Sequence, residues 1–175
     1  YKYREIDRLP EEKSKEAVFG TLIHSTMKFI HEPGLIQPSV EQAIDYFGKH
    51  WNGDLFVNEM EERAAFVQGV EMIQRYYEDN RIAEANPIAL ESRFAIEIGT
   101  EEAGKHVIAG VIDRIDRTHD GYEIIDYKTT KKMPSQDKID NDLQLSIYLR
   151  AFLERYPKEW ERLDTITVSL YFLKH

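Results

Sequence analysis

The sequence predicts an α+β fold in which a helical N-terminal layer precedes a mixed sheet with one further helix packed on it. Two observations predict this class. Apolar residues recur at spacings of three and four through the first half of the chain, and strand-like apolar runs follow between residues 88 and 129 before helical spacing returns. No repeat or low-complexity segment interrupts the 175 residues, so we expect a single domain, with the helical layer in residues 1–86 and the sheet with its helix in residues 87–175.

The helical layer is expected to contain three helices. The first covers residues 17–32 and ends at Pro33-Gly34, which is a turn signal. The second covers residues 39–50 and opens on Ser-Val-Glu-Gln, which resembles a capping box. The third begins near residue 59 and continues into the 80s. It stops before Asn86-Pro87, because a residue that precedes proline avoids the helical conformation.

The second part of the chain changes to strand patterns. The expected elements are strands at residues 88–98, 107–117 and 122–129, a helix at residues 137–156, and a last strand at residues 165–173. The Asp120-Gly121 pair is a strong signal for a hairpin turn between the second and third strands. Pro157 is expected to end the helix.

Composition excludes several kinds of site. With no cysteine, the chain has no disulfide, no thiolate metal site and no iron–sulfur cluster, and it is compatible with a reducing cytoplasm, where we place it. No apolar run approaches the ~18 residues of a membrane span, so no membrane partner is expected. The chain starts among charged and aromatic residues and stops just after an apolar run, which we interpret as a domain excised from a longer protein.

The net charge of −9 argues against indiscriminate nucleic-acid binding, but the charge is unevenly spread. Residues 41–80 contain nine acids and three bases, whereas residues 126–138 contain two acids and four lysines. A local strip that binds phosphate is therefore compatible with an acidic chain. Lys131, Lys132 and Lys138 are its candidate residues, although a solvated loop explains them equally well.

Two carboxylates and a lysine lie in the strand-like segments that Asp120-Gly121 joins. If these two residues form the loop, Asp113 lies opposite Lys128, and Asp126 shares the face of Lys128 because side chains alternate along a strand. The diagonal separation of Asp113 and Asp126 is then ~7–8 Å or less, within reach of one bridging cation.

Two close carboxylates repel by about 4 kcal/mol at ~4 Å and an effective dielectric of ~20. A retained proton, a bridging cation or exposure to water relieves this repulsion. Oxygen ligands suit Mg²⁺, with Mn²⁺ as a substitute, and a nearby lysine can orient a metal-bound water. The alternative is an exposed hairpin whose acids are solvated or paired with Arg114 and Arg117, but apolar neighbours on both strands make solvation less favourable.

Four sequence elements in this order resemble the RecB-like branch of the PD-(D/E)XK nuclease superfamily. They are Gly-x-x-x-His at residues 20–24, Gly-x-Ile-Asp-Arg-Ile-Asp at residues 110–116, Asp-Tyr-Lys-Thr at residues 126–129, and Gln-Leu-x-x-Tyr at residues 144–148. Each element alone is weak, but together they are specific and cover most of the chain. The resemblance implies a restriction-endonuclease-like core, in which flanking helices cover a mixed central sheet.

The resemblance also implies roles for individual residues. The implied catalytic residues are Asp113, Asp126, Lys128, Gln144 and Tyr148. The implied metal ligands are His24, Asp113, Asp126 and the main-chain carbonyl of Tyr127. Lys128 would position the attacking water and stabilise charge on the scissile phosphate. Gln144 and Tyr148, one helical turn apart and so on one face, would line the site.

The function implied is that of a Mg²⁺-dependent deoxyribonuclease, which hydrolyses phosphodiester bonds at DNA ends or in single strands during DNA repair or recombination. Exonuclease and endonuclease action are both compatible with the sequence. No Gly-x-x-x-x-Gly-Lys-Ser/Thr loop occurs, so a helicase motor would belong to a partner or to another part of a longer chain. Two alternatives stay open: a non-catalytic DNA-binding or assembly module that keeps the nuclease fold, and a carboxylate–histidine metallohydrolase for small phosphoesters.

Several other charged residues are expected to have structural roles. Glu91 is either an additional metal ligand or, as we favour, half of an ion pair on an edge strand. Asp116 is out of phase with Asp113 and is expected to pair with Arg114 or a helix. The histidines other than His24 share no spacing and are expected at the surface; they are His31, His50, His106, His119 and His175.

Overall fold

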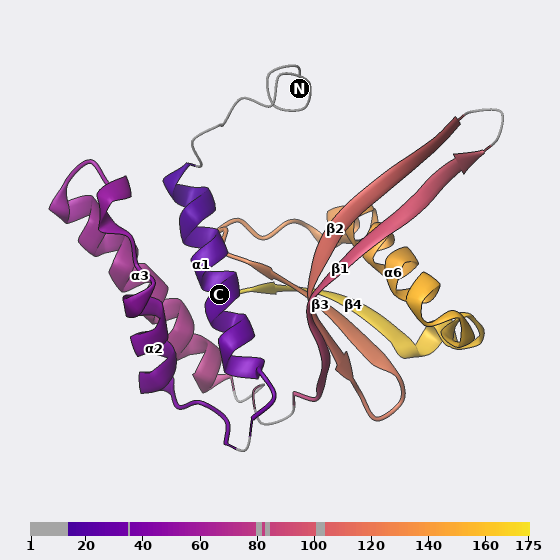
Figure 1. The fold of residues 1–175 in the computed structure, drawn as a ribbon, viewed down its shortest axis with the longest axis horizontal. Coiled ribbons are helices and arrows are strands. Elements are labelled where there is room, and N and C mark those ends of the chain that lie inside the picture. The colour runs from indigo at the N-terminus through magenta and orange to yellow at the C-terminus, as the bar shows by residue number, and fades with distance from the viewer. Residues whose placement is uncertain (1–13, 35, 80–81, 83–84, 101–103) are drawn as a thin grey trace.

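A computed structural model describes residues 14–34, 36–79, 82, 85–100 and 104–175 of the chain. The described residues form three layers, in which helices α1 to α3 lie on one side of a four-stranded sheet and helix α6 lies on the other (Figure 1). The predicted α+β class is confirmed. Residues 1–13 of the expected helical layer lie outside the described part.

Each expected helix or strand has a counterpart in the structure. The helices are α1 (Lys15–His31), α2 (Val40–Lys49), α3 (Glu59–Glu78), α5 (Gln136–Asp140) and α6 (Leu143–Arg155), with short 3₁₀ segments η2 (Gly53–Leu55) and η3 (Pro157–Thr165). The strands are β1 (Pro87–Thr100), β2 (Gly104–Arg117), β3 (Tyr122–Lys128) and β4 (Ile166–Phe172). Within the described ranges, no helix is both long enough and apolar enough to cross a membrane.

Side-chain caps set the starts of the N-terminal helices. The Ser14 side chain accepts a hydrogen bond from the main chain of Ala17, and Asn58 does the same for α3. At α2 the predicted capping box is confirmed, because Ser39 and Gln42 each accept a hydrogen bond from the other's amide. Such caps satisfy amides that have no partner within the first turn of a helix.

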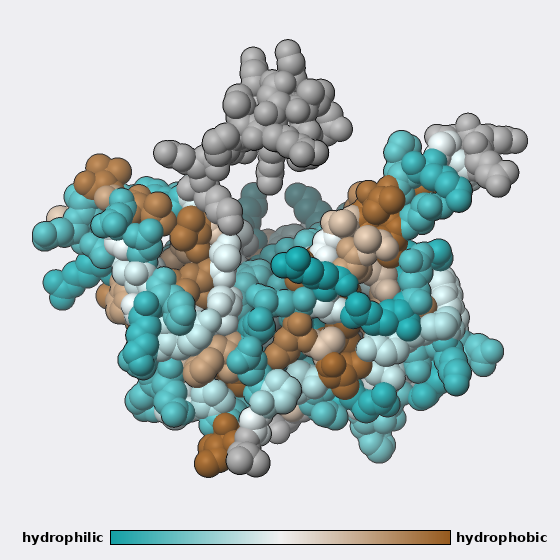
Figure 2. Space-filling model, viewed as in Figure 1, coloured by the Kyte–Doolittle hydropathy of each residue, from teal (hydrophilic) through white to brown (hydrophobic). Residues whose placement is uncertain are grey.

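The sheet has the strand order β1-β2-β3-β4. The β1–β2 and β2–β3 pairs are antiparallel, whereas β3 and β4 are parallel and are joined by a crossover that contains α6. This mixed sheet with helices on both faces is the restriction-endonuclease-like core that the resemblance implies. The β1–β2 hairpin projects beyond the rest of the sheet (Figure 1), and apolar side chains gather along its outer part (Figure 2).

The register between β2 and β3 differs from the prediction. The connection is a four-residue loop over residues 118–121, because Arg117 pairs with Tyr122. The Thr118 amide donates to the Gly121 carbonyl, and the Thr118 hydroxyl accepts from the Gly121 amide. These two hydrogen bonds close a four-residue loop, which is wider than the two-residue Asp120-Gly121 loop that the sequence predicts. The observed pairing is shifted by two residues from the predicted one. A shift of two keeps the parity between the strands, but it places Asp113 level with Asp126 and not with Lys128.

The helix expected over residues 137–156 is divided in two. Helix α5 ends at Asp140, and α6 begins after Asp142, whose side chain accepts hydrogen bonds from the amides of Gln144 and Leu145. Aspartate is a strong N-cap residue, and here it starts a new helix where helical spacing suggested a continuous one. The cap matters for the site because it fixes where the first turn of α6 begins.

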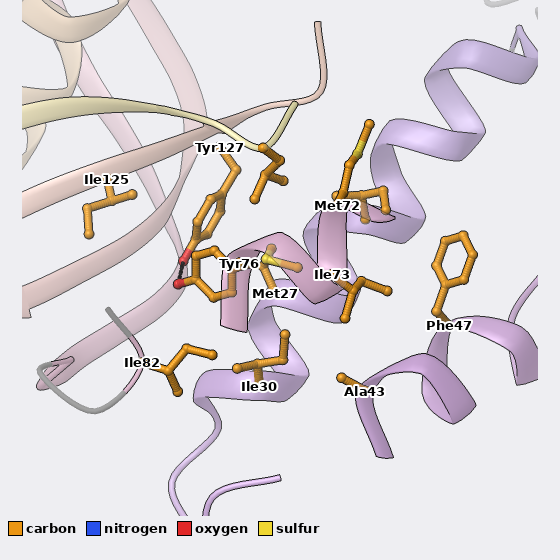
Figure 3. Packing of buried hydrophobic residues seen from close by; sticks show 12 residues of the cluster. Met27, Ile30, Ala43, Phe47, Met72, Ile73, Tyr76, Ile82, Ile125 and Tyr127 are labelled. Atoms are coloured by element: carbon orange, nitrogen blue, oxygen red, sulfur yellow. Dashed lines mark hydrogen bonds between the residues drawn. The ribbon is translucent and has the colours of Figure 1, made fainter. Parts of the chain in front are cut away.

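The core has one apolar cluster on each side of the sheet. The cluster under α1 to α3 includes Met27, Phe47, Ile73 and Tyr76, which point toward one another in Figure 3, together with Ile125 and Tyr127 from β3. The cluster under α6 includes Tyr122 and Ile124 from the same strand. The side chains of β3 therefore alternate between the two clusters, as the period of a strand requires.

Gly69 allows α3 to pack closely on α2. A Cβ atom at this position would overlap the ring of Phe47, which is fully buried. We expect Gly69→Ala to lower the free energy of unfolding by about 1–3 kcal/mol, because the overlap outweighs the better helix propensity of alanine. Urea unfolding would measure the change. Gly48→Ala is the matched control, because its Cβ would make only ordinary contacts with Phe66, and an equal effect of both substitutions would contradict the packing argument.

Candidate active site

The candidate site lies where β2 separates from β3. The pairing of these strands ends at Arg114 and Ile125, one residue before the two aspartates would face each other. The Asp113 Oδ2 atom instead accepts a hydrogen bond of 2.8 Å from the Tyr127 amide, which takes the place of a strand partner. The separation of these two central strands therefore leaves one carboxylate on each of them at the opening.

Asp113 also connects the sheet to the helical layer. His24 of α1 donates from Nδ1 to Asp113 Oδ1 over 3.0 Å. Burial lowers the pKa of His24, but the hydrogen bond and charge of Asp113, with the charge of Asp126, raise it more, so that the pKa lies above its ordinary value. In the protein without metal, the carboxylate of Asp113 thus favours the protonated, charged form of His24.

The alternation of β2 is interrupted at Asp113. Ile112 and Ile115 both belong to the cluster under α6, although they are three residues apart, and Arg114 points to the opposite face. Across the β1–β2 pair, Glu91 has a φ of 43°, a left-handed conformation that is uncommon for a residue with a side chain. Such strain is often found at functional sites. Here the strained residue Glu91 lies on β1 across from the point in β2 where the side chain of Asp113 turns toward His24.

Glu91 itself forms the ion pair that we favoured. Lys28 of α1 lies 2.9 Å from its carboxylate, and both side chains are largely exposed. The strained residue is therefore tied to the same helix that carries His24. Exposed ion pairs contribute little stability, so we attribute to this pair a role in positioning only.

A closed ring of contacts surrounds Asp126 on the α6 face of the sheet. Lys128 Nζ lies 2.5 Å from Asp126 Oδ2 and donates to Gln144 Oε1 over 2.9 Å. Gln144 Nε2 donates to the Tyr148 hydroxyl over 2.7 Å, and that hydroxyl donates to Asp126 Oδ1 over 3.1 Å. Four of the five residues that the resemblance implies as catalytic are thus joined side chain to side chain.

The environment of Asp126 opposes its negative charge. Its carboxyl is 4% exposed, and burial raises its pKa above the ordinary value although Lys128 lowers it; the charge of Asp113 raises it further. Burial likewise raises the pKa of Tyr148, with the charge of Asp126 adding to the effect, so that this phenol remains a hydrogen-bond donor. A cation that bound here would relieve the unfavourable burial of Asp126.

The donor chemistry of this cluster fits a hard divalent cation. Two carboxylates, an imidazole and main-chain oxygens are available, and Asp126 Oδ2 is buried and accepts no hydrogen bond of ordinary geometry from the described residues. As the side chains stand, no three histidine, aspartate or glutamate residues within the described ranges form a group that could hold a metal ion. His24 and Lys128 instead contact the carboxylate oxygens. The main chain of Tyr127 reaches Asp113, and its side chain, buried under the helical layer, packs edge-on against the ring of His24.

A buried polar network that sequence reasoning missed lies directly behind the site. Arg114 is 4% exposed, and its Nη1 atom lies within hydrogen-bond distance of the Tyr76 hydroxyl (2.6 Å), the Tyr127 hydroxyl (2.7 Å) and His31 Nε2 (2.5 Å). Its Nε atom lies 3.0 Å from Asp116 Oδ1, which confirms the pairing expected for Asp116. Burial raises the pKa of Asp116, and Arg114 opposes that shift.

The surface position expected for His31 is wrong. Its side chain is 5% exposed, and burial, with the charge of Arg114, lowers its pKa to about 3. The imidazole is therefore neutral at physiological pH and accepts hydrogen bonds at Nε2. His50, His106, His119 and His175 are exposed, as expected. The sequence carried a signal of this burial, because His31 directly follows Ile30, the last apolar residue of the stripe on α1.

The candidate phosphate-binding lysines lie apart from this cluster. Lys131, Lys132 and Lys138 are all exposed, on the segment between β3 and α6. The main-chain carbonyl of Lys131 accepts a hydrogen bond of 2.7 Å from His175 Nε2, which ties this segment to the residues after β4. Gly20, the first residue of the Gly-x-x-x-His element, faces the same segment, because a Cβ there would lie 3.6 Å from Thr129 Oγ1.

Comparison with protein families agrees with this geometry. A sequence profile described as the PD-(D/E)XK nuclease superfamily matches residues 1–175, the whole chain. No curated protein matches the chain. The match covers the helical layer, the sheet and α6 together, including the residues that contact one another around Asp113 and Asp126. The chain therefore belongs to the PD-(D/E)XK nuclease superfamily.

Proposed function

We propose that this chain is a Mg²⁺-dependent deoxyribonuclease of the RecB-like branch, in which Mn²⁺ substitutes, acting on DNA ends or single strands in repair or recombination. Membership of a nuclease superfamily supports phosphodiester hydrolysis with a divalent metal ion. The observation that carries the finer proposal is a pair of contact sets that meet where β2 separates from β3. One joins His24 to Asp113, and the other runs from Asp126 through Lys128 and Gln144 to Tyr148. These residues come from all four elements of the RecB-like pattern.

The proposed roles follow from these contacts. Asp113, Asp126, His24 and the Tyr127 carbonyl would hold the metal, which when bound neutralises phosphate charge and lowers the pKa of a coordinated water. Lys128 is the cation beside them, and it would orient the attacking water and stabilise charge that develops on the phosphate. Gln144 fixes the position of Lys128, and Tyr148 holds Asp126 from the other side.

The proposal extends to the wider context of the chain. The exposed lysines Lys131, Lys132 and Lys138 would contact DNA phosphates on either side of the cleaved bond. We propose that the chain forms a single intracellular domain. Translocation along DNA would come from a helicase partner.

The proposal is tested by cleavage of end-labelled DNA with the purified chain in Mg²⁺, in Mn²⁺ and in EDTA. We expect cleavage only with a divalent ion, and a loss of about a hundredfold or more in Asp126→Asn, which keeps the shape of the side chain but removes its charge. Asp164→Asn, at an exposed position in η3, is the matched control. Equal cleavage by the two variants would show that Asp126 does not belong to the catalytic site.

The same variants separate the proposal from its two alternatives. Titration calorimetry with Mn²⁺ should give saturable binding in the parent and in Asp164→Asn, and much weaker binding in Asp126→Asn. A non-catalytic module without a metal site would show no saturable binding. A metallohydrolase for small phosphoesters would hydrolyse a chromogenic phosphodiester but leave DNA intact.

A further inference from the structure

A groove separate from the carboxylates runs between α1, α3 and the segment after β3. Its volume is about 580 Å³, within the range of sites that bind small molecules, and the lining residues that matter here are Phe19, Phe56, Ala64, Thr129, Lys131 and Lys174. Thr129 directly follows Lys128, and Gly20 of α1 lies against Thr129. The groove therefore begins at the residue that follows the lysine of the proposed catalytic site, on the α1 side of the sheet.

The apolar part of the groove has aromatic side chains held in fixed positions. The ring of Phe56 stacks on Trp51, with centroids 5.3 Å apart and an interplanar angle of 12°. Phe19 packs edge-on against the same Trp51 ring, with centroids 6.3 Å apart. Both phenylalanines also line the groove, so they present apolar surface without having to be ordered by a ligand.

Among the described residues that line the polar part of the groove, lysines outnumber acids. Lys131 and Lys174 both line it, and burial together with the charge of Lys131 lowers the pKa of Lys174. Of the two acids that line it, Glu61 is paired with Lys15, and Glu16 is exposed. Two lysines that repel each other at the edge of an aromatic groove are complementary to an anionic ligand with a planar apolar group.

We propose that this groove holds an unpaired base of the DNA strand beside the scissile phosphate, with Lys131 and Lys174 on a neighbouring phosphate. The proposal rests on the proposed function and adds a preference for single-stranded DNA. Base stacking on aromatic side chains combined with a cationic backbone contact is the general mode of single-strand binding. The groove meets the site along α1, because Gly20, which lies against Thr129, is one helical turn from His24.

The first test fills the groove and removes one of its charges. Binding of a fluorescent single-stranded oligonucleotide is measured by anisotropy without divalent cations, so that no cleavage occurs. We expect Ala64→Trp to weaken binding about tenfold, because the tryptophan takes the place of the base. Lys174→Gln should weaken binding and reduce the slope of log affinity against log salt by about 0.7. The controls are Val67→Trp, exposed on the same helix, and Lys158→Gln, exposed in η3; neither should change binding.

The second test locates the base. Oligonucleotides with one abasic site at successive positions should lose affinity at one position only, and this loss should disappear in Ala64→Trp. Normal binding by Ala64→Trp, tighter binding of blunt duplex than of single strands, or an abasic scan without a preferred position would each overturn the proposal. Hydrolysis of a chromogenic phosphodiester with Mn²⁺, which needs no base, should be unchanged in Ala64→Trp. Failure of the parent to cleave DNA with Mg²⁺ or Mn²⁺ would count against the proposed nuclease chemistry, whereas the binding assays would still test the groove.

Discussion

Replacing Lys128 with methionine is expected to reduce DNA cleavage by about two to three orders of magnitude, the loss typical when a group that stabilises developing charge is removed. Lys128 Nζ contacts both Asp126 Oδ2 and Gln144 Oε1, so its position does not have to be established during the reaction. Methionine keeps the length and the apolar part of the side chain. The change therefore removes the ammonium group with little loss of packing.

The measurement is the single-turnover rate of cleavage at saturating Mg²⁺, which separates the chemical step from DNA binding. Lys158→Met is the control for a lost surface charge. Lys128→Arg keeps the charge, but its planar guanidinium does not reproduce the contacts of a compact ammonium, so we expect only partial recovery. If Lys128→Met cleaves at the rate of Lys158→Met, Lys128 has no part in the reaction.

The main features of this site follow from strand parity. The predicted loop of two residues is really one of four, but an error of two preserves the parity between the paired parts of β2 and β3. Asp113 and Asp126 therefore still come close to each other where these strands separate, although the alternation of β2 is interrupted at Asp113. The exact pairing was not predictable, because it depends on the Thr118 hydroxyl and on Gly121, whose Cβ would overlap Thr165 from the far end of the crossover.

Features that depend on distant segments were not predictable in the same way. The break between α5 and α6 has a local signal, since Asp142 is a good N-cap residue, and a closer reading of the sequence would have found it. The groove has no local signal. Lys174 follows the last strand, Phe56 follows η2, and only the folded chain brings them to the segment after Lys128. For the same reason the buried environment of Arg114 was missed, because two of its partners, His31 and Tyr76, come from α1 and α3.

Arg114→Met is expected to lower the free energy of unfolding by about 3–5 kcal/mol, the largest effect on stability that we predict for one substitution. Arg114 is the cation paired with Asp116, and both side chains are buried. Without the guanidinium, Asp116 keeps an uncompensated charge or takes up a proton, and the hydroxyls of Tyr76 and Tyr127 lose a donor. Arg117→Met is the control: the exposed side chain of this neighbour donates to the Tyr122 hydroxyl, and we expect a loss of at most about 1 kcal/mol.

A double-mutant cycle distinguishes a penalty for an unpaired charge from a simple loss of packing. Arg114→Met combined with Asp116→Leu replaces both ions with apolar groups, and such replacements are often neutral or stabilising. The double variant should therefore be more stable in urea than Arg114→Met alone. A double variant that loses the sum of the two single effects would contradict the charge argument.

Because Tyr127 donates its amide to Asp113 and its hydroxyl contacts Arg114, a refolded double variant should also cleave DNA more slowly than the parent. That result would make Arg114 a positioning residue for the metal-binding carboxylate, acting from the opposite face of the sheet.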